Sequence, residues 1–166
     1  SFLVSFGLTK AFANLLAGGW SDRVGRKPIL ILGWLCGSPV PFLLIHAQSW
    51  DWVIFANLLL GINQGFCWST TVIMKIDLVG PRQRGLAMGL NEFAGYLAVA
   101  LSAWLTGYLA GSYGLRPVPF YSGIVFSALG LLLSVFAIRE TLAHSEHESR
   151  IRDIPKRNAP IPFKQI

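Results

Sequence analysis

The sequence predicts an all-α, polytopic bundle of transmembrane helices. Of its 166 residues, 53% are hydrophobic and only 13% are charged, whereas a soluble domain of this length usually carries about 25% charged residues. The hydrophobic residues gather in five long runs, each close to the ~20 residues that an α-helix needs to span a bilayer. Backbone amides in hydrocarbon need partners within their own segment, so runs of this length satisfy them as helices.

The five predicted helices occupy most of residues 1–141. They cover roughly residues 1–19, 29–47, 52–74, 85–110 and 118–138. Pro39 and Pro41 should bend the outer half of the second helix, because each removes a backbone hydrogen-bond donor. Small residues let neighbouring helices approach closely in a membrane. The glycines expected to do so are Gly33, Gly37, Gly85, Gly89 and Gly95.

Basic linkers alternate with nearly cation-free ones along the chain. The linkers at 20–28 and 75–84 and the tail after 138 are rich in Lys and Arg, whereas 46–52 has none and 111–118 has one. The positive-inside rule predicts this alternation for successive spans, with the basic linkers in the cytoplasm. The 14 Lys and Arg residues therefore indicate orientation in a membrane, and we expect no nucleic-acid partner.

Residues 142–166 differ in composition from the rest of the chain. They are polar, basic and rich in proline, which is typical of an exposed linker and not of a second core. We expect a cytoplasmic linker segment here, after the helices of residues 1–141. An odd number of spans with an external start, and no visible signal peptide, further suggest a fragment of a larger membrane protein.

One motif is specific enough to suggest a family. The stretch 18–30 has the spacing Gly-x3-Asp-Arg-x-Gly-Arg-Lys between the first two apolar runs. It resembles the loop between transmembrane helices 2 and 3 of major facilitator superfamily (MFS) transporters. The stretch 77–89 resembles the inner loop before helix 5 of the same family. The resemblance covers about residues 1–141 and implies helices 2–6 of the N-terminal six-helix half. Assignment to helices 8–12 is the alternative, because the motif recurs in second halves.

The resemblance implies that the charged turn helps to close the cytoplasmic side of the transporter by bonding across to the other half. The expected gate residues are Gly18, Asp22, Arg23, Gly25, Arg26, Lys27, Asp77, Arg82 and Arg84. Gly18 and Gly25 permit a tight turn, and Asp22 can accept hydrogen bonds from Arg26 or from free amides at the next helix start. The alternative is a basic loop that only sets topology, with solvated interface charges.

Charged side chains also lie deep inside the predicted helices. Lys10 lies about 15 Å from Trp20 at ~1.5 Å per residue, near the middle of a ~30 Å hydrocarbon core, and Glu92 lies about 10 Å inside its helix. A charge at the helix centre costs roughly 2.5–3.5 kcal/mol, so such groups usually face a water-filled cavity or a partner. The resemblance also implies that the helix at 52–74 lines the central cavity.

A substrate or coupling cavity is the role predicted for a polar set on three helices. These residues are Lys10, Asn14, Asn57, Gln64, Trp68 and Glu92. The alternatives are structural pairing of the two charged residues and helix–helix hydrogen bonding by the amides. Two departures from the family pattern leave the coupling ion and the direction of transport open. Gly61 stands where many proton-coupled members carry arginine, and Gly95-Tyr96 stands where drug antiporters commonly carry Gly-Pro.

The combined prediction is a multi-pass protein of the plasma (inner) membrane. It forms part of a secondary active transporter that moves a small solute by alternating access. The expected partners are the solute, a proton or another coupling ion, membrane lipids and the C-terminal half of the carrier. A non-transporting membrane receptor or scaffold on the same fold is the alternative. We expect no enzyme, cofactor or metal site, because the sequence shows no nucleotide-binding loop, metal-ligand cluster or nucleophile–base pair.

Overall fold

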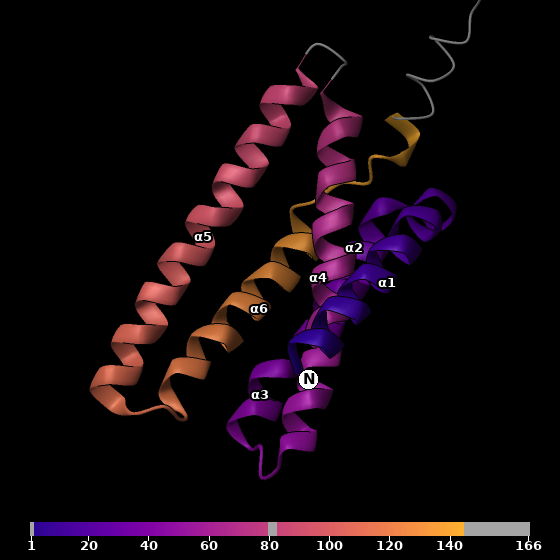
Figure 1. The fold of residues 1–166 in the computed structure, drawn as a ribbon. Helices are drawn as coiled ribbons and strands as arrows, with labels where there is room; N and C mark the ends of the chain where they lie inside the picture. Colours follow the sequence, from indigo (N-terminus) through magenta and orange to yellow (C-terminus); the bar gives the residue numbers. More distant parts are fainter. Residues whose placement is uncertain (1, 80–82, 145–166) are drawn as a thin grey trace, which may run out of the picture.

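The computed structural model describes residues 2–79 and 83–144. Their regular elements are all helices: α1 (Phe2–Val24), α2 (Arg26–Gly37), α3 (Val40–Ile45), α4 (Trp50–Leu78), α5 (Arg84–Tyr113) and α6 (Val118–Phe136). In the bundle, α4 packs against α1 and α2, α6 lies beside α2 and α3, and α5 is the outermost helix (Figure 1). The predicted all-α bundle is therefore confirmed.

The reversal between the first two helices is much shorter than the predicted turn at 18–30. α1 continues to Val24, Gly25 alone is non-helical, and α2 begins at Arg26. Gly25 has φ 108°, a value that glycine adopts without the steric cost of a Cβ atom. Gly18 lies inside α1, and a Cβ atom there would meet open space. The prediction that Gly18 shapes a tight turn was therefore wrong, because nothing breaks the helix before Gly25.

The second predicted helix is divided at its prolines. α2 ends at Gly37 and α3 begins at Val40, with Pro39 as the N-cap and Pro41 in the first turn of α3. A proline in the first turn of a helix loses no intrahelical hydrogen bond, because that amide has no partner there. The predicted bend is confirmed, and it amounts to a break between two helices.

Glycines bring α1, α2 and α4 into close contact. A Cβ atom added to Gly61 or Gly65 of α4 would lie 2.9 Å or 2.4 Å from the nearest atom of α1. One added to Gly33 or Gly37 of α2 would lie 2.7 Å or 2.5 Å from α4, which confirms those two predictions. The space between the three helices is filled by Ala13, Ala17, Ile29 and Phe66.

The predicted glycine contacts of α5 are only partly correct. A Cβ atom on Gly95 would come within 2.7 Å of the Trp68 indole of α4, as expected. Gly85 and Gly89 face open space, so their predicted packing role was wrong. The physical reason is that α5 lies against its neighbours over only part of its length (Figure 1).

Three helical stretches are long and apolar enough to cross a membrane by length and composition. They are Arg26–Ile45, Arg84–Tyr113 and Val118–Phe136. Large apolar side chains on α5, such as Phe93 and Trp104, are largely exposed, as expected of a lipid-facing helix. The other two predicted spans, α1 and α4, are not among these three stretches of the described residues, and they carry polar side chains such as Lys10 and Gln64.

Candidate functional site

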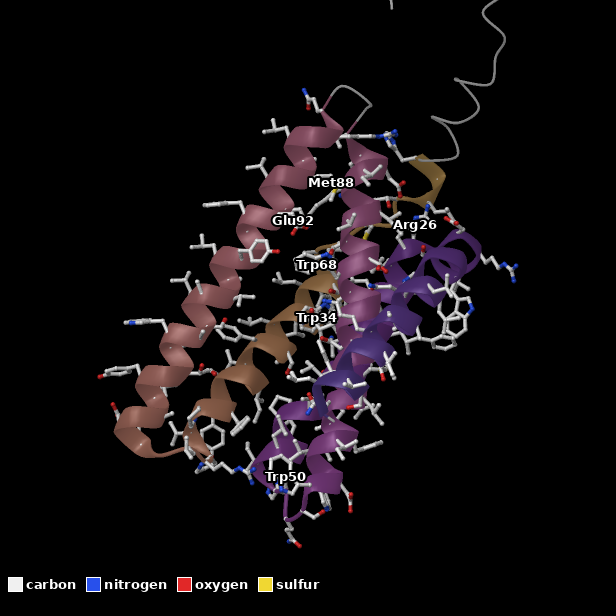
Figure 2. All side chains as sticks on the ribbon, viewed as in Figure 1. Arg26, Trp34, Trp50, Trp68, Met88 and Glu92 are labelled. Carbon is white, nitrogen blue, oxygen red and sulfur yellow. The ribbon has the colours of Figure 1, made fainter. Side chains whose placement is uncertain are left out.

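A buried arginine joins three helix ends at one end of the bundle. Arg26, the first residue of α2, is 4% exposed. Its Nε donates to Asp77 Oδ2 of α4 at 3.2 Å, and its Nη1 donates to Ser21 Oγ at 3.2 Å and to the Asp22 carboxylate, both on α1. A buried guanidinium needs such partners, because an unpaired buried charge is strongly unfavourable. Figure 2 shows Arg26 toward the end of the bundle opposite Trp50.

The two carboxylates that bind Arg26 have different surroundings. The Asp77 side chain is 8% exposed, whereas the Asp22 side chain is 67% exposed. Asp77 Oδ2 also accepts a hydrogen bond from Thr141 Oγ1 at 3.0 Å. Asp77 is therefore an interior group held from two sides, and Asp22 reaches the surface while still fixed by Arg26.

Glu140 caps the start of α2 from the segment that follows α6. Its Oε1 accepts from the backbone amides of Arg26, Thr141 and Leu142 at 2.9, 2.9 and 3.0 Å, and its Oε2 accepts from the Lys27 amide at 3.0 Å. Burial alone raises the pKa of the Glu140 carboxyl, but the four amide donors outweigh burial and hold the pKa below its ordinary value. The carboxylate also complements the positive end of the α2 dipole.

Gly25 is required at this junction for two reasons. Its φ of 108° disfavours any residue with a side chain. In addition, a Cβ atom there would lie 2.6 Å from Glu140 Oε2. The absence of a side chain thus lets Glu140 reach the α2 amides. We call this set the Arg26 junction. It comprises Ser21, Asp22, Gly25, Arg26, Asp77, Glu140 and Thr141.

The structure brings together only part of the predicted gate set. Asp22, Gly25, Arg26 and Asp77 meet as described, and Lys27 Nζ donates to the Val135 carbonyl at 2.7 Å. Of the remaining members, Gly18 lies inside α1. Arg23 is exposed near the end of α1, Arg84 begins α5, and Arg82 lies outside the described residues.

Sequence reasoning missed the contribution of residues 140–141. The signal was present, because Arg139-Glu140-Thr141 is a short charged stretch directly after the last apolar run. This three-residue stretch alone does not indicate that Glu140 binds the backbone amides at the start of α2, which lie more than a hundred positions earlier in the chain. Only the folded bundle shows that these segments meet.

Lys10 lies between two aromatic rings near the middle of α1. The side chain is half-buried, and its Nζ is 5.9 Å from the Phe6 ring centroid and 5.8 Å from that of Trp68 on α4. These distances fall within the range of cation–π attraction. The Trp68 side of α4 also faces α5, because Gly95 packs against the indole. Lys10 of α1 and Trp68 of α4, two of the residues predicted for a cavity, thus lie close together.

The predicted amide residues have different surroundings. Asn14 Oδ1 accepts from Ser69 Oγ at 2.8 Å, which links α1 to α4. Asn57 Nδ2 donates to the Val53 carbonyl of its own helix at 2.8 Å, and Gln64 is half-buried. Asn14 therefore makes the helix–helix bond that was the alternative to a cavity role.

Glu92 belongs to a short polar chain between α4 and α5. Lys75 Nζ donates to Asn91 Oδ1 at 2.5 Å, and Asn91 Nδ2 donates to Glu92 Oε1 at 3.3 Å. In Figure 2, Glu92 and Trp68 lie in the space between these two helices. Asn91 is buried and was not predicted. It connects a cation and a carboxylate across the helix interface.

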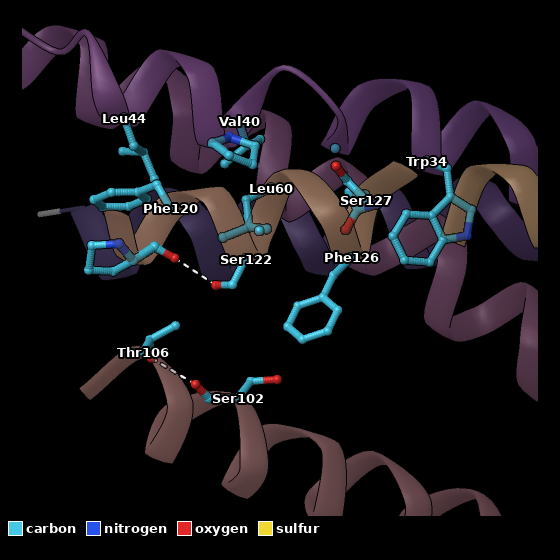
Figure 3. A pocket seen from close by; sticks show the side chains of 15 residues that line it. Trp34, Val40, Leu44, Leu60, Ser102, Thr106, Phe120, Ser122, Phe126 and Ser127 are labelled. Atoms are coloured by element: carbon cyan, nitrogen blue, oxygen red, sulfur yellow. Dashed lines mark hydrogen bonds between the residues drawn. The ribbon is translucent and has the colours of Figure 1, made fainter. Parts of the chain in front are cut away.

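A separate cavity of about 330 Å³ lies between α5 and the rest of the bundle. Its wall includes Trp34, Phe120 and Phe126, with Ser102 and Thr106 on the α5 side (Figure 3). The Thr106 hydroxyl donates to the backbone of its own helix, as do other hydroxyls here, so the cavity offers mainly apolar surface. The six predicted cavity residues do not line it.

The described residues contain no group of three or more His, Cys, Asp or Glu that could hold a metal ion. What the described part of the chain offers is a helix bundle with apolar outer surfaces, a buried charge junction at one end and charged groups between its inner helices. These features define a multi-pass integral membrane protein.

The chain belongs to the major facilitator superfamily: the model of that family matches residues 1–166. It is 36% identical over 141 residues to multidrug resistance protein MdtG of Salmonella paratyphi C, covering 84% of this chain and 34% of that protein. It is 24% identical over 170 residues to multidrug resistance protein 2 of Bacillus subtilis, covering 97% of this chain and 42% of the relative. The chain therefore spans well under half the length of these curated relatives.

Proposed function

We propose that this chain is part of a secondary active transporter in the plasma membrane that moves a small organic solute by alternating access. Membership of the major facilitator superfamily and the relatives named as multidrug resistance proteins support this proposal. Since the chain covers only 34–42% of two such relatives, we propose that it forms most of one half of the carrier, helices 2–6. Residues 142–166 would then be the cytoplasmic linker to the second half.

The Arg26 junction is the observation that carries the proposal. Hydrogen bonds and ion pairs of the Arg26 guanidinium and the Glu140 carboxylate connect the ends of α1, α2 and α4 with the segment after α6. Alternating access is largely a rigid-body rocking of one half against the other, and this network holds the helix ends of one half together as a unit. We place this end in the cytoplasm, because the linkers that meet there carry most of the positive charge.

The exposed Asp22 carboxylate and the neighbouring Arg23 are the groups that we propose for contact with the second half of the carrier. Arg26 fixes Asp22 in place while two thirds of its side chain stays exposed. A charge that is both oriented and accessible can form an ion pair across the closing surface at little entropic cost. Such pairs would close the cytoplasmic side in one state and separate in the other.

The solute would contact the groups between α1, α4 and α5. Lys10, Trp68 and Glu92 lie there on three helices, and charged groups at this depth usually face a cavity or a partner. A proton or another ion is the proposed coupling partner. We expect neither catalysis nor a bound cofactor.

Flux measurements with the full-length carrier test the proposal. The carrier is reconstituted into proteoliposomes, and the uptake of a panel of labelled organic solutes is compared with that of protein-free liposomes. Saturable, protein-dependent flux of at least one solute is expected. Absence of flux for every solute, with binding retained, would favour the receptor or scaffold function.

Cysteine accessibility tests the gate separately. A cysteine introduced on the cytoplasmic cavity wall should be labelled faster in Asp22→Asn than in the parent, because loss of the charge opens that side. Equal labelling rates would contradict the gate role of Asp22.

A further inference from the structure

Lys10 is a membrane-embedded cation whose charge is not balanced by an anion in the described structure. Within residues 2–79 and 83–144, the carboxylates of Asp22 and Asp77 pair with Arg26 and not with Lys10. The Lys10 ammonium instead faces the rings of Phe6 and Trp68 at 5.9 Å and 5.8 Å. An ammonium carries three N–H donors, and ring faces supply attraction to its charge without the oxygen acceptors that those donors prefer.

The nearby charges on α4 and α5 are already balanced. Lys75 and Glu92 are joined through the Asn91 side chain, which accepts from the lysine and donates to the carboxylate. This chain contains one positive and one negative charge, so it adds no net charge to the space between the helices. Among the described residues between these helices, the positive charge of Lys10 therefore has aromatic rings as neighbours and no carboxylate paired with it.

The surroundings of Lys10 also specify the shape of a ligand. Trp68 remains 36% exposed, so its indole presents a flat apolar surface next to the ammonium. Flat rings stack on such a surface with offset or edge-to-face geometry. One small molecule could contact both groups, with an anionic group at the Lys10 ammonium and a flat ring against the Trp68 indole.

We propose that Lys10, Phe6 and Trp68 form a binding site for an organic anion with a flat apolar body, of the aromatic carboxylate class. This inference rests on the proposed transport function and names its substrate class. On binding, the ammonium exchanges its cation–π contacts for charge-assisted hydrogen bonds to the carboxylate, which are shorter and stronger. A cationic ligand is disfavoured in the same place, because Lys10 would repel it.

A matched pair of probes tests the sign of the charge on wild-type protein. Naphthalene-2-carboxylate and 2-naphthylmethylammonium have the same ring and opposite charges. Each is titrated by calorimetry into the full-length carrier in detergent at neutral pH. The carboxylate should bind at least about tenfold more tightly, as expected for a hydrogen bond between charged groups. Equal binding, or preference for the ammonium probe, would overturn the proposal without any variant.

Substitutions at Lys10 test the residue itself. Lys10→Met should weaken carboxylate binding by about tenfold or more, Lys10→Arg should retain most of it, and Trp68→Leu should weaken it several-fold. Arg116→Met removes an exposed cation from the linker before α6 and should leave binding unchanged. Unchanged or tighter binding in Lys10→Met would overturn the proposal. That is the result expected if a carboxylate elsewhere in the carrier pairs with Lys10.

The two proposals fail in different ways. Flux is measured on the same preparations with whichever solute the wild-type carrier transports. A carrier that transports a solute but prefers the ammonium probe overturns the substrate class and leaves the transport function standing. A carrier that binds the carboxylate through Lys10 but moves no solute overturns the transport function and leaves the site standing.

Discussion

Arg26 and Lys10 are both cations in the interior of the same bundle, but their surroundings are opposite. Arg26 is held by two carboxylates and a hydroxyl, whereas Lys10 faces two aromatic rings. A buried charge that is paired with carboxylates of the same chain contributes to the stability of the fold, and its removal should destabilise the protein. A charge held only by weak contacts is available to a ligand, and its removal should affect function more than folding.

The largest effect is expected from removing the buried partner of Arg26. Asp77→Ala should destabilise the carrier by about 3 kcal/mol, because the buried Nε of Arg26 and the Thr141 hydroxyl both lose their acceptor and Arg26 keeps only its exposed partner Asp22. Asp22→Ala removes the exposed partner of the same guanidinium and should cost less than about 1 kcal/mol. Thermal unfolding of both variants in detergent measures the two effects. Similar decreases in unfolding temperature for the two variants would show that burial does not determine how much each carboxylate contributes to stability.

Gly25→Ala tests the backbone geometry of the Arg26 junction. A non-glycine residue in this region of φ and ψ costs about 1–3 kcal/mol, and the added Cβ atom would also displace Glu140. Gly18→Ala is the matched control. It lies within α1 in open space, and alanine should stabilise the helix by up to about 1 kcal/mol. Equal unfolding temperatures for the two variants would contradict the requirement for glycine at position 25.

Glu140→Gln tests the cap on α2. Loss of the carboxylate should cost about 0.5–2 kcal/mol at neutral pH, the range for N-terminal caps. Since the pKa of Glu140 is lower in the folded state, its stabilisation is complete above about pH 4.5 and is lost as pH falls through the folded-state pKa. The difference in unfolding temperature between wild type and Glu140→Gln should therefore shrink below that pH. A constant difference down to pH 3 would argue against the charged cap.

The smallest effect concerns the interhelical hydrogen bond between Ser69 and Asn14. Ser69→Ala should cost about 0.6 kcal/mol, the average for hydrogen bonds between membrane helices. It should also leave ligand binding at Lys10 unchanged, because Asn14 then lacks only a structural partner. Weakened binding of the naphthalene carboxylate by the same variant would show that Asn14 belongs to the ligand site.

The helices and the Arg26–Asp22 contact were predictable from local sequence. Hydrophobic runs of about twenty residues predict helices in lipid, and the spacing of residues 22 and 26 places both side chains on one helical face or at one turn. The break at Pro39 was also predictable, since proline removes a backbone donor. Each of these features depends on residues close together in the chain.

The rest of the Arg26 junction depends on contacts between distant segments. Glu140 reaches Arg26 across 114 positions, and Thr141 reaches Asp77 across 64. No local pattern specifies which of several charged residues occupies a particular helix end. Gly18 was misjudged for a related reason, because a glycine can serve a turn or continue a helix, and the neighbouring residues decide which.

A parallel test of Lys10→Met and Arg26→Met is the most direct measurement of the difference between the two cations. Unfolding temperature and solute flux are measured for both variants in the full-length carrier. We expect Arg26→Met to lower the unfolding temperature sharply, and Lys10→Met to abolish flux while the unfolding temperature stays close to that of wild type. The account would be contradicted if Lys10→Met unfolded at the same reduced temperature as Arg26→Met, or if it transported solute at the wild-type rate.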